Sequence, residues 1–119
     1  RADWFDAGAL ASLCGQDWEV KPQSNRVGMR LQGTPLQRTR QGELASEGTV
    51  AGALQVPPEG LPVLFLADHP ITGGYPVIAV VVDSQLDRAA QVPIGGKIRF
   101  RWAASPITEN TTPEQEASN

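Results

Sequence analysis

Two almost wholly apolar runs constrain the fold of this chain more than any other feature of its sequence. They are LPVLFLAD, residues 61–68, and PVIAVVVD, residues 76–83. A strand with one face in water alternates apolar and polar side chains, whereas a continuous short apolar run is typical of a strand covered on both faces. The two runs therefore predict strands inside a barrel or at the centre of a sheet.

Shorter β-like segments, bounded by turn residues, surround these runs. The segment KIRFRWA, residues 97–103, alternates apolar and polar side chains, which predicts a strand with one exposed face. The other predicted strands are DWEVK (17–21), RVGMRLQG (26–33) and TVAGALQV (49–56). A mainly antiparallel β domain follows, and we expect the edge of such an incomplete sheet to need a partner segment.

Helical patterns are short and lie outside the strand-rich middle. Over residues 3–15 apolar side chains recur at spacings of three and four, with Asp3 as the expected N-cap, and residues 86–91 predict one helical turn. Residues 104–119 are rich in Pro, Thr, Glu, Ser and Asn, which predicts a disordered acidic tail. Residues 1–103 are then a single domain.

Composition excludes several kinds of site. A single Cys cannot form an internal disulfide, and one Cys with one His falls short of the four ligands of a structural zinc site, so we expect no metal site in this chain. A net charge of -3 without a basic cluster argues against nucleic acid. No apolar run approaches the roughly 20 residues of a membrane span, and the start RADWFDAG lacks a secretory pattern. We therefore expect a cytoplasmic protein that does not bind a membrane.

Three polar clusters beside predicted strands are candidate functional sites, and the first is SNRVGMR. Arg26 and Arg30 have the even spacing that places two side chains on one face of a strand, with Gly28 between them. Two guanidinium groups on one face can hold a carboxylate, a carboxyphosphate or a phosphate. A solvated or ion-paired strand face explains the same spacing.

The second cluster is GALQVPPEG, residues 52–60. Gln55 offers an amide donor and an amide acceptor directly before the stiff pair Pro57 and Pro58. A binding site needs such a rigidly placed polar side chain, but an ordinary strand end has the same composition, so both interpretations stay open.

The third cluster is DHPITGGYP, residues 68–76, which joins the two apolar runs and holds the only His and the only Tyr of the chain. Gly73 and Gly74 can turn successive N–H groups toward one anion. A wide hairpin loop whose Tyr75 covers the core is the alternative. A Ser-His-Asp triad is disfavoured because Asp68 and His69 are adjacent and would point to opposite faces of a strand.

The amino-acid sequences of the three clusters resemble those of a known family. The matching segments, in order, are SNRVGMRL, SEGTVAGALQVPPEGLPVLFLAD and ITGGYPVIAVV. They resemble the C-terminal part of the biotin-dependent carboxyltransferase family, which includes allophanate hydrolase subunit 2, the C subunit of 5-oxoprolinase and the regulator KipA. The family pattern reads SDRMGYRL and LADRQTTGGYP, from which this chain departs at Asn25, Val27, Met29, His69, Pro70 and Ile71. The resemblance carries no charge-dependent role to Asn25 or His69.

The resemblance implies a cyclophilin-like β-barrel, of which this chain would be one half of a larger subunit. It also implies a fragment of an ATP-dependent amide-processing hydrolase that needs its missing half. The expected enzyme is 5-oxoprolinase, which converts 5-oxoproline to glutamate, or the related urea carboxylase/allophanate hydrolase carboxyltransferase. A KipA-like regulator that binds a histidine-kinase inhibitor, or a structural half-barrel without a ligand, is the alternative.

Cofactors, partners and residue roles are likewise implied by the resemblance. ATP is expected, bound on this chain or on a partner, and biotin only in the urea carboxylase case. The expected partners are the related B subunit, also known as allophanate hydrolase subunit 1 (KipI-like), the A subunit of 5-oxoprolinase and a small-molecule amide substrate. The implied catalytic residues are Arg26, an anion clamp, and Tyr75, a lid or proton donor. The implied substrate-binding residues are Ser24, Arg30, Gln55, Thr72, Gly73 and Gly74.

Overall fold

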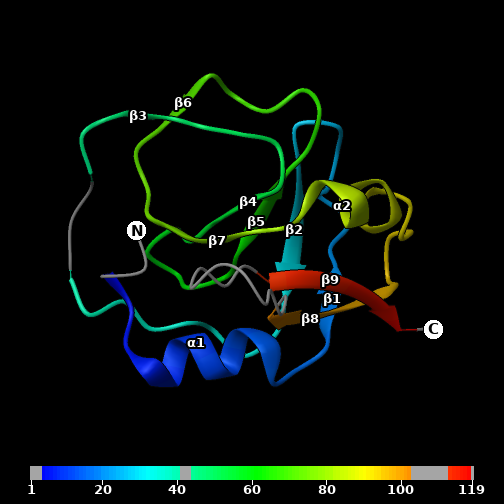
Figure 1. Ribbon diagram of the computed structural model, residues 1–119, viewed down its shortest axis with the longest axis horizontal. Coiled ribbons are helices and arrows are strands. Elements are labelled where there is room, and N and C mark those ends of the chain that lie inside the picture. Colours follow the sequence, from blue (N-terminus) through cyan, green and yellow to red (C-terminus); the bar gives the residue numbers. More distant parts are fainter. Residues whose placement is uncertain (1–3, 41–43, 103–112, 119) are drawn as a thin grey trace, which may run out of the picture.

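The main element of the fold is one curled antiparallel sheet that forms half of a barrel (Figure 1). The computed structural model describes residues 4–40, 44–102 and 113–118, the last as backbone. The seven strands of the sheet run in the order β7-β4-β5-β2-β1-β8-β9. In chain order they are β1 (Trp18–Val20), β2 (Gly28–Gln32), β4 (Ala53–Gln55), β5 (Val63–Phe65), β7 (Val77–Val80), β8 (Lys97–Trp102) and β9 (Pro113–Ser118).

Two further strands, β3 (Glu47–Gly48) and β6 (Thr72–Gly73), pair only with each other in the described residues and form a separate two-stranded sheet. In Figure 1 this small sheet lies at the top of the molecule, across the main sheet from α1. The helices are α1 (Ala7–Cys14) and α2 (Asp83–Ala90). The predicted fold class, a mainly β half-barrel with one short N-terminal helix, is confirmed, and α2 is longer than the single turn that the sequence predicted.

The core lies between α1 and the concave side of the sheet. Trp18 and Leu64 are fully buried, and Phe100 is 1% exposed. The Trp18 Nε1 atom donates a hydrogen bond of 2.9 Å to the Leu13 carbonyl at the end of α1, which ties the helix to β1. A hydrogen-bonded indole can be buried without leaving a polar atom unsatisfied.

Helix α1 begins later than the sequence predicted. Its N-cap is Asp6, whose Oδ1 accepts the Ala9 N–H at 2.9 Å, whereas the predicted cap, Asp3, lies outside the described residues. Trp4 and Phe5 cannot join the helix because they are used elsewhere: the Trp4 carbonyl accepts the Thr39 N–H at 2.7 Å, and Phe5 forms a β-bridge with Arg38.

The two apolar runs became β5 and β7, but only β5 is central. It lies between β4 and β2, whereas β7 ends the described strand order and buries Ile78 while Val77, Ala79 and Val80 stay partly exposed. The prediction that both runs are covered on both faces is therefore correct for β5 and wrong for β7 in this part of the chain.

The predicted disordered tail differs from the structure at residues 113–118. These residues form β9, which pairs along the whole of β8 from Lys97 opposite Ser118 to Trp102 opposite Pro113. The physical reason is that an edge strand such as β8 presents unpaired backbone groups that another segment can satisfy. Residues 103–112 and 119 lie outside the described residues, so the prediction is not tested there.

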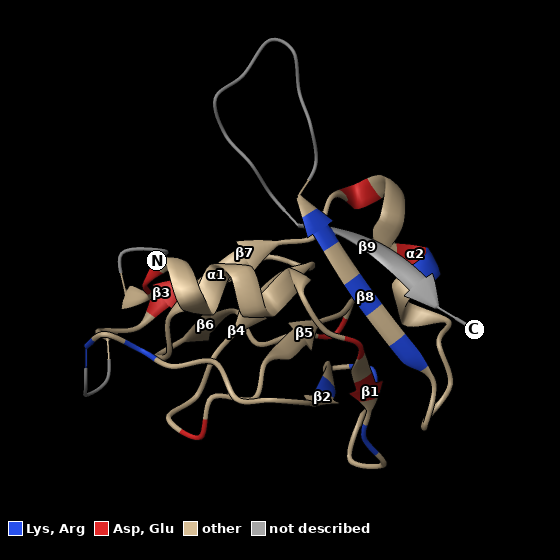
Figure 2. Ribbon diagram, turned by 90° about the horizontal axis from the view of Figure 1, so that it is seen from below, with Lys and Arg blue, Asp and Glu red and all other residues tan. Residues whose placement is uncertain are grey.

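Basic side chains of β8 form a row that acidic neighbours balance (Figure 2). Lys97 Nζ lies 2.8 Å from Glu19 Oε1, and Arg99 Nη1 lies 3.3 Å from Asp17 Oδ1. The row is therefore not a clustered basic surface. Within the described ranges no helix has both the length and the apolar character to cross a membrane.

Candidate functional site

Most of the predicted site residues line one cavity of about 420 Å³, which we name the polar pocket. Its lining includes the following predicted residues: Arg30, Gln55, Thr72, Gly73, Gly74 and Tyr75. The other two, Ser24 and Arg26, line a neighbouring cavity of about 590 Å³, which we name the apolar pocket. Asn25 lines both, so residues 24–27 divide one cavity from the other.

Strand register sets the floor of the polar pocket. Arg30 of β2 and Gln55 of β4 are both directly opposite Val63 of β5, one on each side. Residues directly opposite each other in a sheet point to the same face, so Arg30, Val63 and Gln55 form one row across three strands. We name it the β2–β5–β4 row. Arg30 is at the exposed end and Gln55, which is 9% exposed, at the buried end.

Gln55 is a nearly buried polar side chain that faces the cavity. Within the described part of the chain its side-chain amide has no hydrogen-bond partner, although buried amides normally have one. The pairing of β4 with β7 shifts register between Leu54 and Gln55, and such bulges re-aim the side chain that follows. The amide is thus available to a molecule in the pocket.

The β6 segment closes over this amide. A Cβ atom at Gly73 would lie 2.6 Å from Gln55 Nε2 and 3.3 Å from Thr49 Cγ2, so a side chain at position 73 would push Gln55 out of place. Glycine at this position therefore allows the backbone to approach the amide closely. Gly74 and Tyr75 follow and complete this wall of the pocket.

Arg26 and Arg30 do not share a strand face, contrary to the prediction. Strand β2 begins only at Gly28, because Asn25 Oδ1 accepts the N–H groups of Val27 and Gly28 at 2.9 and 3.2 Å and holds a turn before it. Arg26 lies in this turn, and its Nε is 3.3 Å from Asp68 Oδ2, with the two side chains 85% and 54% exposed. An exposed pair of this kind contributes little stability.

Ser24 has a structural position rather than one facing the polar pocket. Its Oγ accepts the Arg30 N–H at 2.9 Å and donates to the Arg30 carbonyl at 3.3 Å. The hydroxyl therefore holds the backbone of Arg30, which lines the polar pocket, while Ser24 itself lines the apolar one.

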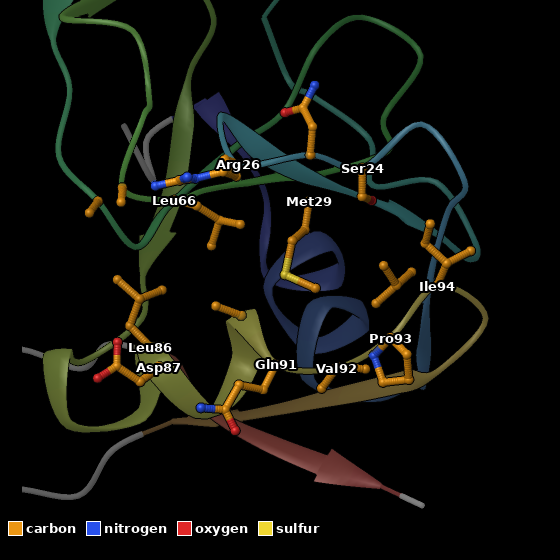
Figure 3. Close-up of a pocket in the computed structure, with 15 residues that line it drawn as sticks. Ser24, Arg26, Met29, Leu66, Leu86, Asp87, Gln91, Val92, Pro93 and Ile94 are labelled. Atoms are coloured by element: carbon orange, nitrogen blue, oxygen red, sulfur yellow. The ribbon is translucent and has the colours of Figure 1, made fainter.

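The apolar pocket lies between β2 and α2 (Figure 3). Met29 points from β2 into the hollow, and Leu66, Leu86 and Val92 complete its walls. Arg26 and Asp87 are at its edge (Figure 3). This cavity can accept an apolar group.

Two residues that are not among the predicted site residues, Thr49 and His69, contact each other beside the polar pocket. His69 Nδ1 lies 3.0 Å from Thr49 Oγ1 and 2.7 Å from the Pro70 carbonyl, and its ring stacks on Phe65 with centroids 6.0 Å apart. Asp68 pairs with Arg26 instead of His69, so no Asp-His pair forms. Thr49 belongs to a segment that resembles the family, but its spacing in the sequence does not predict a contact with His69.

Metal ligation is not indicated by the side chains. Among the residues that the structure describes, no group of three or more His, Cys, Asp and Glu residues could hold an ion. The residues that line the polar pocket include one with a guanidinium group, Arg30, two with side-chain amides, Asn25 and Gln55, and two with hydroxyls, Thr72 and Tyr75. This set can bind a small molecule that combines an anionic group with an amide.

Comparisons with known proteins show the family and the fold of this chain. Residues 1–102 match the family model described as carboxyltransferase domain, subdomain A and B. The chain is 41% identical over 96 residues to the C subunit of 5-oxoprolinase from Escherichia coli (strain K12), covering 81% of this chain and 31% of that protein. It is 42% identical over 84 residues to the C subunit of 5-oxoprolinase from Haemophilus influenzae, covering 71% and 27%.

A solved structure shows the same fold. The urea amidolyase of K. lactis superposes with a TM-score of 0.75 at 24% identity, covering 82% of this chain and 6% of that one. This likeness concerns the fold alone. The chain spans less than a third of the length of either curated relative.

Proposed function

The chain belongs to the family of carboxyltransferase domains, subdomain A and B, and on this premise we propose that it is the substrate-binding part of the C subunit of a 5-oxoprolinase. The observation that carries the proposal is the β2–β5–β4 row, which places a cation and an unpartnered amide on one floor. The cavity of about 420 Å³ is of the size that small-molecule ligands occupy.

The chemistry of 5-oxoproline matches the two ends of this row. Its lactam holds the N–H and C=O groups on the same side, so a primary amide such as Gln55 can donate to one and accept from the other. Its carboxylate suits the guanidinium of Arg30, which can form two parallel hydrogen bonds. Urea and allophanate offer similar amide groups, which is why the related carboxyltransferase of urea metabolism is the second substrate class within this proposal.

Cleavage of the amide develops negative charge on its oxygen. We assign the stabilisation of this charge to the backbone amide of Gly74, and the role of lid or proton donor to Tyr75, because both residues line the pocket. The Gly73 amide is paired with Glu47 in the β3–β6 sheet. Arg26 lines the apolar pocket and pairs with Asp68, so the anion-holding role falls to Arg30 alone.

The polar pocket offers Arg30 as its cationic side chain, which suits a single carboxylate better than the triphosphate of ATP. We propose that ATP binds on a partner, with the B and A subunits of the enzyme as the partners, because the curated relatives are named as subunits.

We also propose a cytoplasmic location. The relatives are enzyme subunits, which does not favour the regulatory alternative.

Calorimetric titration of the assembled enzyme tests the proposal with three ligands. 5-Oxoproline carries both groups, 2-pyrrolidinone only the lactam, and proline only the carboxylate with a ring amine. Arg30→Gln is expected to weaken 5-oxoproline binding at least tenfold and to leave 2-pyrrolidinone unchanged, because only the former has a carboxylate. Gln55→Leu is expected to weaken the binding of both lactams, 5-oxoproline and 2-pyrrolidinone, because the lactam N–H and C=O groups lose their hydrogen-bond partner.

Arg26→Gln is the matched control, because Arg26 is a neighbouring arginine outside the polar pocket. It is expected to change binding less than twofold. Wild-type enzyme that binds none of the three ligands, or Arg30→Gln and Arg26→Gln variants with equal effects, would contradict the assignment. Binding of urea in place of 5-oxoproline would move the proposal to the second substrate class.

A further inference from the structure

The two-stranded β3–β6 sheet has little packing to hold it. We name residues 47–50 and 70–74 the flap. Glu47, Gly48 and Thr72 are exposed, and Gly73 is only partly buried. Because strands are normally positioned by the apolar area that they bury, something else must fix the position of this pair.

Cavities lie on both sides of the flap. The polar pocket is on one side, and a hollow of about 210 Å³ lined by Leu44, Thr49, Val77 and Val80 is on the other. Gly73 and Tyr75 line both cavities. The flap thus separates two spaces, and a small shift of its backbone changes the shape of the polar pocket.

A polar contact set joins the flap to the main sheet. Thr49 Oγ1 donates to the Pro70 carbonyl, and His69 Nδ1 is within 3.0 Å of Thr49 Oγ1 and 2.7 Å of the same carbonyl. The His69 ring stacks on Phe65 of β5 at an interplanar angle of 13°, and the His69 N–H donates to the Leu66 carbonyl. His69 therefore contacts both the main sheet and the flap.

The contacts of Nδ1 suit one tautomer of the imidazole. In the tautomer that carries its proton on Nδ1, this atom donates to the Pro70 carbonyl at 2.7 Å. The Thr49 hydroxyl donates to the same oxygen. The Pro70 carbonyl is thus contacted by Thr49 of the flap and by His69, which directly precedes the second flap segment.

We propose that His69 is a positioning residue for the polar pocket: through Thr49, Pro70 and Phe65 it holds the flap so that Gly73 lies against Gln55. The local geometry rests on the contacts above and not on the identity of the substrate. Its consequence for binding rests on the proposed function. With the flap held in this way, the position of Thr72 to Tyr75 depends on hydrogen bonds rather than on burial.

Amide hydrogen exchange on the whole chain tests the local claim without any ligand. The reporters are Thr49 N–H, bonded to the Ile71 carbonyl at 3.0 Å, and Leu44 N–H, bonded to the Gly74 carbonyl at 3.0 Å. His69→Phe keeps the ring stack and removes the donor, and Thr49→Val keeps the shape and removes the hydroxyl. Each is expected to speed exchange at both reporters about fivefold, as the loss of one hydrogen bond would.

The reference amides are Lys21 and Val81, which bond to the Arg30 and Gly52 carbonyls in the main sheet. They are expected to change less than twofold, and the double variant is expected to resemble either single variant because both remove one contact set. His69→Asn, whose amide nitrogen replaces Nδ1, is expected to restore part of the protection. Thr34→Val, on an exposed loop, is the matched control.

Two results would overturn the proposal. One is unchanged exchange at Thr49 and Leu44 in both single variants, and the other is equal acceleration at all four amides, which would mean general destabilisation. A separate titration of the assembled enzyme with 5-oxoproline should then show weaker binding in His69→Phe than in wild type. Failure of wild type to bind 5-oxoproline would remove the proposed function and leave the exchange result standing, whereas normal binding with unchanged exchange would remove the positioning role alone.

Discussion

Strand β5 and the β3–β6 flap are adjacent in this molecule but are held by different forces. Leu64 of β5 is fully buried between β2 and β4, with Met29 and Leu54 opposite it. The flap strands expose most of their residues and are tied down by the contacts of His69 and Thr49. Burial of apolar area contributes a large and non-directional free energy, whereas a few hydrogen bonds contribute a small free energy but fix a direction. The main sheet therefore stabilises the fold, whereas the flap sets the shape of the polar pocket.

Truncating the centre of the sheet gives the largest expected effect. Leu64→Ala should lower the free energy of unfolding by roughly 2–5 kcal/mol, because it removes buried methyl groups and leaves a cavity. Urea denaturation measures it. The matched change on the flap, Ile71→Ala at a side chain that is 85% exposed, should stay within about 0.5 kcal/mol. Equal losses in the two variants would abolish the distinction between the regions.

Adding one methyl group to the flap should affect binding rather than stability. Gly73→Ala brings a Cβ to 2.6 Å from Gln55 Nε2 and should displace that amide, raising the dissociation constant for 5-oxoproline about tenfold, or about 1.4 kcal/mol. Gly48→Ala is the control, because it lies opposite Thr72 on the same flap and a Cβ there meets nothing within 4 Å. Calorimetry of both variants should separate them; indistinguishable affinities would count against the contact.

Removing the hydroxyl that supports Arg30 should have a smaller effect. Ser24→Ala deletes the Oγ that accepts the Arg30 N–H at 2.9 Å, which should cost about 1 kcal/mol of unfolding free energy. Ser46→Ala, at an exposed position next to the flap, should change nothing measurable. Denaturation curves of the two variants compare Ser24, which holds the backbone of Arg30, with the exposed Ser46. An unchanged free energy of unfolding in Ser24→Ala would show that Arg30 is held by strand pairing alone.

The smallest expected effect concerns the thiol on α1. Burial raises the pKa of Cys14, partly offset by the charge of Arg99. A raised pKa means less thiolate at a given pH, so modification by an aromatic disulfide reagent at pH 8 should be several-fold slower than in the urea-unfolded chain. The folded state also disfavours the thiolate form of Cys14. The stability that this group contributes is therefore complete below the ordinary thiol pKa and is lost as pH rises through the raised pKa of the folded state. Equal reaction rates in folded and unfolded chains would contradict this.

The sequence predicted the strands well because their signal is local. The apolar run at 61–68 and the alternation at 97–103 each describe the environment of one segment, and both correspond to strands. The prediction that Arg26 and Arg30 share a face was wrong for a local reason as well, since Asn25 starts a turn that even spacing cannot reveal.

Relations between strands could not be predicted in the same way. Arg30 and Gln55 lie in one row only because Val63 pairs with both, and register of this kind depends on the whole sheet. The family resemblance grouped Gln55 with Thr72 to Tyr75, and the structure places these residues around one cavity. It also brought in Ser24 and Arg26, which the structure places around the neighbouring cavity.

The β2–β5–β4 row has a consequence for how such a site can change. Neighbouring strands are about 4.8 Å apart, so the separation between the backbone positions of Arg30 and Gln55 is set in whole steps of the sheet. Lengthening a substrate by one bond cannot be matched by moving Arg30 or Gln55 slightly. Moving either group along its own strand shifts it by two residues or turns it to the other face. Selectivity for ligand length is therefore inherited from the spacing of the backbone, and new substrates must be accommodated by exchanging side chains at fixed positions.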